Sequence, residues 1–246
     1  MIDRQRALLC TADGEVFVGR AAGATGATTG EAVFNTSMTG YQEILTDPSY
    51  AGQVVVMTSS HIGNYGVTDL DEQSSAPAVS GLVVRSLSRR DSNWRSSGTV
   101  GEYLRRHGVV AIADVDTRRL TRHLRDRGAM PVAIGVDTDE SELREMAASA
   151  PSMVGLDLAS AVTTKHAYSL DPVGERQGRV VAIDLGMKQD ILANLTGRGF
   201  GVDVVPASTD AGAIVALEPD GIFVSNGPGD PEPLTGVIDT LRSLLG

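Results

Sequence analysis

The sequence predicts an α/β protein, with a mixed β/α N-terminal domain followed by the first three βα units of a parallel-sheet domain. Two observations lead to this fold class. In the last third of the chain, short apolar runs alternate with segments whose apolar residues recur every three or four positions, as parallel strands and their covering helices do. The stretch 169–178, SLDPVGERQG, is rich in turn formers and charge, so it predicts a linker between residues 1–168 and residues 179–246.

The composition is typical of a globular protein, with 41% apolar and 21% charged residues over 246 positions. The formal charge of −10 argues against nucleic-acid binding, which needs a basic surface. Cys10 is the one cysteine, so we expect no internal disulfide and a reducing compartment. The N-terminus shows no secretory pattern, and apolar runs such as Val109–Ala113 are far too short to cross a bilayer. We therefore expect a cytoplasmic protein that binds neither nucleic acid nor a membrane.

The first domain is expected to mix strands and helices. Apolar segments 7–11 and 16–18 flank the turn dipeptide Asp13-Gly14, which predicts a β-hairpin. Thr99 is followed three residues later by Glu102, a capping-box pattern that begins a short helix. Apolar patterns predict further strands at 53–57, 81–85 and 109–113, and further helices from Asp116 to Gly128, at 139–150 and at 159–162.

The second domain is expected to repeat a strand and a helix three times. The predicted strands are 180–183, 201–205 and 221–224, and the predicted helices contain residues 191–195, 211–217 and 234–244.

The turn Ser225-Asn-Gly-Pro-Gly-Asp-Pro231 follows the last predicted strand. In open α/β sheets, ligands bind beyond the carboxyl ends of the strands. Gly227 and Gly229 lack side chains, so they permit positive φ and the close approach of a ligand to their N–H groups, as an oxyanion hole requires. Asp230 and Pro231 suit the start of the next helix. A plain βα turn explains the same residues, whereas a phosphate loop is disfavoured because the G-x-G-x-x-G and Gly-Lys-Ser/Thr patterns are both missing.

Several stretches resemble a known family, in the order in which the family has them. The turn at 225–231 is similar to that of class I (triad-type) glutamine amidotransferases. The stretch Val33–Tyr50, VFNTSMTGYQEILTDPSY, closely resembles the N-terminal domain of the small subunit of carbamoyl-phosphate synthase. Amidotransferases of anthranilate or guanylate synthesis share only the final turn and leave residues 23–66 unexplained. Four further stretches resemble the carbamoyl-phosphate synthase small subunit: Gly23–Gly26, His61–Asn64, Val110–Arg122 and Asp184–Gly186.

The resemblance implies a fold and an activity. Residues 179–246 would begin a flavodoxin-like amidotransferase domain and leave it incomplete. The family's small subunit hydrolyses L-glutamine to glutamate and ammonia, and the ammonia passes through a channel to a large subunit. In this heterodimeric ligase, the large subunit uses ATP and Mg to make carbamoyl phosphate for arginine and pyrimidine synthesis, so no cofactor is expected here. By position, Gly227 would be an oxyanion-hole donor, and Ser49, Gly227 and Gly229 would line the glutamine site.

The resemblance stops before the family's catalytic triad. In the family, the next strand leads to a Gly-x-Cys-x-Gly-type elbow with the nucleophilic cysteine, and the partner histidine and glutamate follow it. These residues are absent up to Gly246, so we expect a chain truncated at its C-terminus and inactive alone, because a thiolate activated by histidine is the centre of the reaction. The strand at 221–224 would also become an exposed edge. The alternative is a non-catalytic interaction module that binds the large subunit.

Other candidate residues have simpler explanations. Cys10 lies in an apolar run without a glycine elbow, which favours a small buried hydrophobe over a nucleophile. His61 follows a predicted strand, and a hydrogen-bonded loop histidine explains it better than a site residue. The other three histidines show no metal-ligand spacing, so no metal site is expected. The arginines between 118 and 127 form either a solvated helix face or a docking surface for an acidic partner such as the large subunit.

Overall fold

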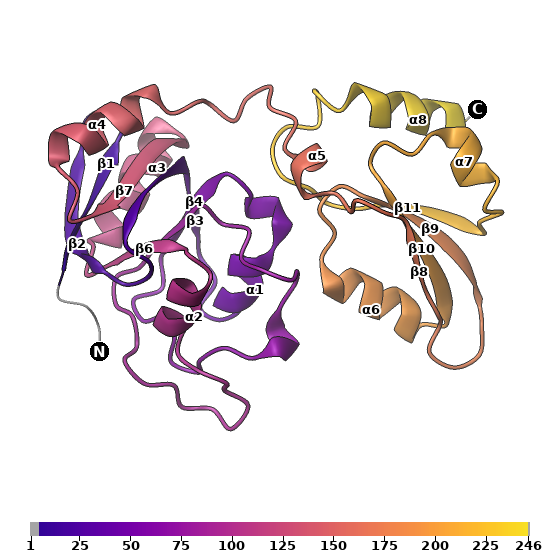
Figure 1. Cartoon of the computed structure of the whole chain (residues 1–246), viewed down its shortest axis with the longest axis horizontal. Coiled ribbons are helices and arrows are strands. Elements are labelled where there is room, and N and C mark those ends of the chain that lie inside the picture. The colour runs from indigo at the N-terminus through magenta and orange to yellow at the C-terminus, as the bar shows by residue number, and fades with distance from the viewer. Residues whose placement is uncertain (1–4, 246) are drawn as a thin grey trace. The chain divides into compact units, whose positions relative to one another are not determined.

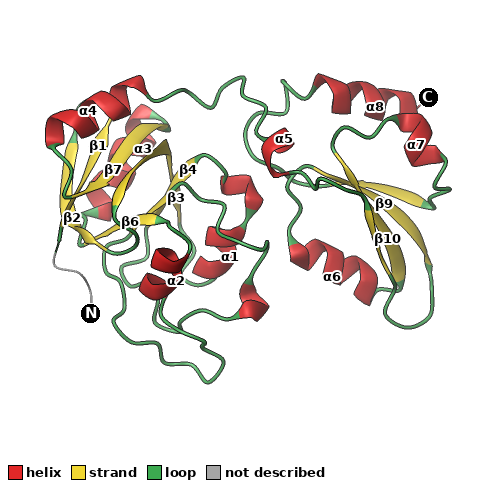
Figure 2. Cartoon of the chain, viewed as in Figure 1, coloured by secondary structure: helices red, strands yellow, loops and turns green. Residues whose placement is uncertain are grey.

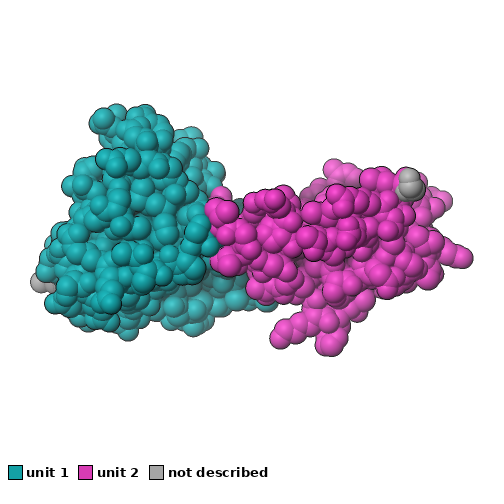
Figure 3. Space-filling view, turned by 90° about the horizontal axis from the view of Figure 1, so that it is seen from above, with its two compact units in different colours: residues 1–46, 52–153 teal, residues 47–51, 154–246 magenta. Residues whose placement is uncertain are grey.

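The computed structural model describes residues 5–245, and they form two compact units (Figure 3). The barrel unit comprises Met1–Thr46 and Gly52–Met153. The sheet unit comprises Asp47–Ala51 and Val154–Gly246. The short segment Asp47–Ala51 thus belongs to the sheet unit, although barrel residues precede and follow it in the sequence.

In the described chain, seven strands close the barrel unit into a barrel, in the order β1-β2-β6-β5-β4-β3-β7 (Figure 2). The pairs β3–β4, β4–β5 and β5–β6 are parallel, and the other pairs are antiparallel. All seven strands contribute to one apolar cluster, which fills the barrel interior. The strands are β1 (Arg6–Thr11), β2 (Val16–Ala21), β3 (Gly26–Asn35), β4 (Gln53–Met57), β5 (Gly81–Val83), β6 (Val110–Ala113) and β7 (Met130–Val136).

Helices cover the barrel and complete its core. Leu120 and Leu124 of α3 join the interior cluster, whereas Leu143 of α4 packs on Leu8 and Cys10 of β1 in a separate cluster. No helix within residues 5–245 has the length and apolarity that a bilayer span requires. The helices of this unit are α1 (Tyr41–Thr46), α2 (Val100–Arg106), α3 (Thr117–Arg127) and α4 (Glu140–Ser149), with the 3₁₀ turn η2 (Asp69–Asp71).

The sheet unit holds four described strands in the order β11-β9-β10-β8. β9 pairs in parallel with β10 and β11, and β8 pairs antiparallel with β10. Helix α6 covers one face of the sheet, and α7 and α8 cover the other (Figure 1). The strands are β8 (Tyr168–Leu170), β9 (Gly178–Asp184), β10 (Phe200–Pro206) and β11 (Gly221–Val224), and the helices are α5 (Ala159–Val162), α6 (Gln189–Gly197), α7 (Ala211–Val215), α8 (Thr235–Leu245) and the 3₁₀ turn η1 (Pro48–Tyr50).

The structure confirms the predicted fold class and most of the predicted elements. The three βα units are β9-α6, β10-α7 and β11-α8. The predicted hairpin forms with Cys10 opposite Val16, and Thr99 and Glu102 make both hydrogen bonds of the capping box. Strands β3 and β7 escaped the sequence analysis because each contains glycine, which is uncommon inside strands.

The predicted linker at 169–178 needs correction, because the boundary between the units falls between Met153 and Val154. Residues 168–170 form β8, whose backbone pairs with Val202–Val204 of β10. The segment looked like a linker because β8 is short and has little apolar content, so its strand conformation depends on the partner strand rather than on its own pattern.

The predicted exposed edge at residues 221–224 is present within the described chain. β11 pairs with β9 on one side only. Ile222 is 40% exposed and Val224 is 37% exposed, which is unusual for apolar residues of a parallel sheet.

A buried carboxylate joins three strands of the sheet unit. Asp203 on β10 is 8% exposed, and it accepts hydrogen bonds from Arg179 on β9 and from Ser169 on β8. The hydrogen bond from Arg179 is the main reason why the pKa of Asp203 lies below its usual value, against the opposing effect of burial. Since the pKa is depressed in the folded state, this stabilisation is present above the unfolded pKa and is lost as the pH falls through the folded pKa.

We predict that Asp203→Asn lowers the unfolding free energy of the sheet unit by about 1–3 kcal/mol at neutral pH, because Arg179 loses a charged acceptor. The difference from the parent chain should begin to narrow below about pH 4, the usual pKa of an unfolded aspartate, and should be lost only as the pH falls through the depressed pKa of folded Asp203. Hydrogen exchange of the amides in β8, β9 and β10 measures this effect. Asp239→Asn removes an exposed pair with Arg242 and is the control, expected to change the exchange little. Equal protection of these amides from exchange in both variants would show that the Asp203–Arg179 pair does not stabilise the sheet.

Candidate functional site

Three segments of the sheet unit meet at the carboxyl ends of β9 and β11. They are the loop after β9, the turn after β11 and the segment Asp47–Ala51. At Gly186, in the loop after β9, an added Cβ would lie 3.1 Å from Pro48 Cβ and 3.3 Å from Pro228 Cδ. Gly186 also has φ +115°. The three segments therefore pack against one glycine that has room for no side chain.

Asp184 at the end of β9 organises the first of these loops. Its carboxylate accepts hydrogen bonds from the N–H groups of Gly186 (2.8 Å), Met187 (2.7 Å) and Thr164 (2.7 Å). Asp184 is buried, and backbone donors of this kind satisfy a buried carboxylate without a cation. The loop after β9 is thus fixed by its own backbone rather than left to move.

Ser225 attaches the turn after β11 to the loop after β9. Its N–H donates to the carbonyl oxygen of Ile183. Its Oγ accepts from the N–H of Leu185 at 2.8 Å and donates to the carbonyl oxygen of Asn226 at 2.7 Å. The buried hydroxyl uses both a donor and an acceptor, so it sets the position of the residues that follow.

The two glycines of the turn are required for different reasons. An added Cβ at Gly227 would lie 2.3 Å from the carbonyl oxygen of Leu185, so close packing excludes any side chain there. Gly229 has φ +72°, so positive φ is used at this position and not at Gly227. Within residues 5–245, neither N–H donates to a protein acceptor. Neither amide is used in the hydrogen bonding of the described chain.

The expected helix start at Asp230 needs correction. The Asp230 carboxylate accepts from the N–H of Glu232 at 2.9 Å, and α8 begins only at Thr235. Asp230 closes a local turn, and Pro231 and Pro233, which lie between it and α8, delay the helix.

A hydrogen bond from the side chain of Asn226 connects Ser49 to this site. The Nδ2 atom of Asn226 donates to Ser49 Oγ at 2.6 Å and to the carbonyl oxygen of Gly186 at 3.3 Å. Asp47 supports Ser49 from the other side, because its carboxylate accepts from the Ser49 N–H at 2.9 Å and forms an ion pair with Lys188. The structure thus brings Ser49 against Asn226, the residue that precedes Gly227 in the turn, whereas Gly229 lies next to Leu156 and Leu158.

The sequence analysis assigned no role in the site to Asn226, Asp184 or Lys188. Asn226 was read only as a turn residue. Its position between Ser225 and Gly227, at the end of a predicted parallel strand, was the available signal. Asp184 and Lys188 flank the loop after the first predicted strand, which ends at the same edge of the sheet.

Cys10 has no features of a nucleophile. It lies on β1, is 0% exposed and packs with Leu8, Ala133 and Leu143. Burial raises the pKa of its thiol, so the reactive thiolate is disfavoured. The prediction that Cys10 acts as a small buried hydrophobe is confirmed.

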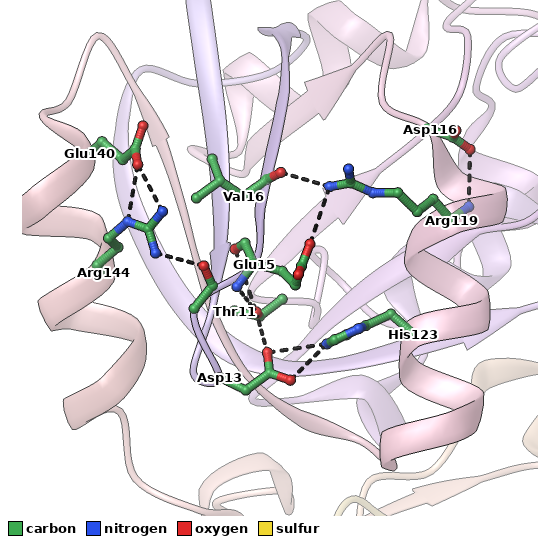
Figure 4. A network of polar contacts seen from close by, with 10 residues as sticks. Thr11, Asp13, Glu15, Val16, Asp116, Arg119, His123, Glu140 and Arg144 are labelled. Carbon is green, nitrogen blue, oxygen red and sulfur yellow. Dashed lines mark hydrogen bonds and ion pairs between the residues drawn. The ribbon is translucent and has the colours of Figure 1, made fainter.

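The polar network near Cys10 holds the β1–β2 turn between two helices rather than forming a catalytic group (Figure 4). His123 of α3 contacts the Asp13 carboxylate through Nε2 at 2.9 Å, and Arg144 of α4 donates to the carbonyl oxygen of Gly14 at 2.6 Å. Burial raises the pKa of Asp13, but hydrogen bonds from Thr11 and His123 outweigh it and leave the pKa below its usual value. Within residues 5–245, His, Cys, Asp and Glu form no group that could hold a metal ion.

The arginines of α3 divide into two sets. In the first set, Arg119 donates to the carbonyl oxygen of Val16 at 2.7 Å and lies over the Phe17 ring at 4.0 Å. Arg125 pairs with Asp126, and the charge of Arg127 acts on Asp13. Arg118 and Arg122 are exposed, and neither has a partner among the described residues. Only this second set is free to meet another molecule.

The parallel strands and the glycine-rich turn lie in residues 181–246, which match the family described as glutamine amidotransferase class-I. Residues 9–134 match the carbamoyl-phosphate synthase small chain, CPSase domain. The chain belongs to the carbamoyl-phosphate synthase small chain family.

Individual relatives agree with this assignment. The chain is 48% identical to the carbamoyl phosphate synthase small chain of Syntrophotalea carbinolica, over 98% of this chain and 68% of that protein. It is also 48% identical to the small chains of Pseudomonas aeruginosa and Escherichia coli, over 97% of this chain and 68% and 67% of theirs. The chain therefore spans about two thirds of these relatives. An aminopeptidase from Aneurinibacillus sp. aligns with a TM-score of only 0.33 at 12% identity, over 74% of this chain and 38% of that one, which is too weak to indicate a common fold.

We predict that Gly227→Ala destabilises the sheet unit by roughly 2 kcal/mol or more, because the new methyl group meets the Leu185 carbonyl oxygen. Gly236→Ala is the matched control, since Gly236 lies in α8 with no atom within 4 Å of an added Cβ. The control should be neutral or stabilising by up to about 1 kcal/mol. Hydrogen exchange of β9 and β11 amides distinguishes the two variants, and similar protection in both would rule out the proposed close packing.

Proposed function

We propose that this chain supplies part of the glutamine site of a carbamoyl-phosphate synthase small subunit. The observation that carries the proposal is the meeting of Ser49 with the Asn226–Gly229 turn in a chain of this family. The full protein would hydrolyse L-glutamine to glutamate and ammonia. The ammonia would pass to a large subunit, which uses ATP and Mg to make carbamoyl phosphate for arginine and pyrimidine synthesis in the cytoplasm.

The geometry suits the charges that arise in amide hydrolysis. Attack on the side-chain amide of glutamine converts its carbonyl oxygen into an oxyanion, and preorganised N–H donors stabilise that charge. The amide of Gly227 is held by close packing and has no acceptor within residues 5–245, so it is our candidate for the oxyanion-hole donor. The Gly229 N–H and the Ser49 hydroxyl would bind other polar atoms of glutamine.

The nucleophile has to come from elsewhere in the full protein. Cys10 is buried in the barrel unit, and the chain spans about two thirds of its relatives. We assign the nucleophilic cysteine and its histidine and glutamate partners to the portion of the relatives that this chain does not match.

We predict that the purified chain releases no glutamate from L-glutamine, whereas a full-length protein together with its large subunit does. A coupled assay for glutamate measures both. Cys10→Ser should leave the full-length protein active, because Cys10 is a buried hydrophobe. Turnover by the isolated chain that survives Cys10→Ser would contradict the assignment of the nucleophile, and an inactive full-length complex would contradict the proposed function.

A non-catalytic role in binding the large subunit is the second candidate, and exposed Arg118 and Arg122 on α3 favour it. Unpaired arginines on a rigid helix suit an acidic partner surface. This role is compatible with the first, since the barrel unit would bind and the sheet unit would contribute to the glutamine site.

We predict that Arg118→Glu combined with Arg122→Glu weakens co-purification with the large subunit at least about tenfold, because two attractive charges become repulsive. Arg89→Glu with Arg90→Glu is the control, since it reverses two exposed arginines elsewhere on the barrel unit. The comparison should be made at low and high salt, because charge pairing weakens with ionic strength. Unchanged binding would identify α3 as a solvated face, and equal losses in both variants would indicate a general effect of charge.

A further inference from the structure

The side chain of Asn226 has only one possible orientation in this site. Its Nδ2 lies 3.3 Å from the carbonyl oxygen of Gly186, and a backbone carbonyl can only accept a hydrogen bond. If the amide were flipped, two carbonyl oxygens would face each other. The amide nitrogen therefore faces Gly186, and its second N–H points to Ser49 Oγ at 2.6 Å.

This orientation fixes which way the Ser49 hydroxyl acts. A serine hydroxyl has one proton to donate and lone pairs with which to accept. Because Asn226 donates to Ser49 Oγ, that oxygen is an acceptor in the pair, and the hydroxyl proton stays free. Within residues 5–245, the Ser49 hydroxyl donates to no acceptor. The pair thus presents a hydrogen-bond donor, suited to a carboxylate or carbonyl oxygen of a ligand.

A second atom of Asn226 also lacks a partner. Its Oδ1 is buried, and no donor in the described chain reaches it. A buried acceptor without a donor is costly and uncommon in folded proteins. The side-chain amide keeps this conformation through the two hydrogen bonds of Nδ2, to Ser49 and to Gly186, while Ser225 holds the backbone carbonyl of Asn226. The free Ser49 proton is what this arrangement offers to a ligand, and it suits an oxygen acceptor such as the carboxylate of an α-amino acid or the oxygen of a carboxamide.

We propose that Asn226 is a positioning residue of the glutamine site, which fixes Ser49 as a hydrogen-bond donor to the substrate. The proposal rests on the proposed function, because it takes Ser49 as a ligand of glutamine. It adds a residue that acts through Ser49 and a reason why an amide is needed at this position.

Asn226→Asp tests this with almost no change in shape. A carboxylate accepts hydrogen bonds and has none to donate, so the Ser49 proton would turn to the new carboxylate and away from the substrate. In the full-length protein with its large subunit, we expect the KM for glutamine to rise about 10- to 100-fold, as the loss of a hydrogen bond to a charged group does. We expect kcat to change far less. The rate of glutamine-driven carbamoyl phosphate synthesis is divided by the rate with added ammonia in the same preparation. This ratio corrects for differences in the amount of folded protein and in the activity of the large subunit.

A double-mutant cycle separates positioning from simple bracing of the turn. If Asn226 acts through Ser49, the Asn226→Asp substitution should add less than about threefold to KM in a Ser49→Ala background. Asn194→Asp is the matched control, because Asn194 lies exposed on α6 of the same unit, and it should leave KM unchanged. Asn226→Ser keeps a donor hydroxyl and should show a smaller defect than Asn226→Asp.

The possible outcomes are distinct. A full KM defect of Asn226→Asp that persists in the Ser49→Ala background would overturn the proposal, as would an unchanged KM in the single variant. A fall in glutamine-driven and ammonia-driven rates together would show a structural role and would also overturn it. A wild-type complex that works with ammonia but not with glutamine would instead refute the proposed function.

Discussion

The contact between the turn after β11 and the loop after β9 is the constraint on which the site depends. The Leu185 carbonyl leaves no room for a side chain at Gly227, and the Leu185 N–H donates to Ser225 Oγ. Both backbone groups of Leu185 therefore contact the neighbouring turn. Because β9 and β11 are parallel neighbours, their loops emerge at the same edge, and this short contact converts two loops into one rigid surface. If the amides of Gly227 and Gly229 bind glutamine as proposed, little loop order has to be gained on binding.

Polar groups inside the protein, rather than apolar packing, determine the shape of this surface. Asp184 satisfies three backbone N–H groups, and Asp47 holds the N–H of Ser49. Each carboxylate fixes a loop whose backbone would otherwise be left without acceptors at a sheet edge. The segment Asp47–Ala51 belongs to the same compact unit as these loops, although Ser49 and Asn226 are 177 positions apart in the sequence. The site is thus a product of tertiary structure and not of one local motif.

The sequence predicted those elements whose causes are local. The capping box at Thr99 and the alternation in the second domain depend on neighbours within a few residues, and they form as expected. The barrel was not predicted, because strand order depends on pairings between distant segments. Strand β3 contains Gly30, where an added Cβ would lie 2.7 Å from the Gly52 carbonyl oxygen. That glycine reflects close approach between strands, a requirement that a single sequence does not display. β8 was read as a linker for the same reason, since its partner β10 decides its conformation.

Part of the candidate site could also be proposed from the sequence. As in the fold, the features with local causes were recognised and those that depend on distant segments were not. Gly227 and Gly229 could be proposed from the sequence because backbone donors need glycine at a strand end, which is visible in sequence. The connection of Ser49 to the turn came only from family resemblance, since nothing in the string around Ser49 distinguishes it from an ordinary turn. Asn226 was missed because its importance lies in the direction of one hydrogen bond. That direction is set by the Gly186 carbonyl oxygen, which belongs to a different loop. A residue whose role is to orient another can be recognised only when donors and acceptors are counted in three dimensions, where an amide beside a carbonyl oxygen has a single permitted orientation.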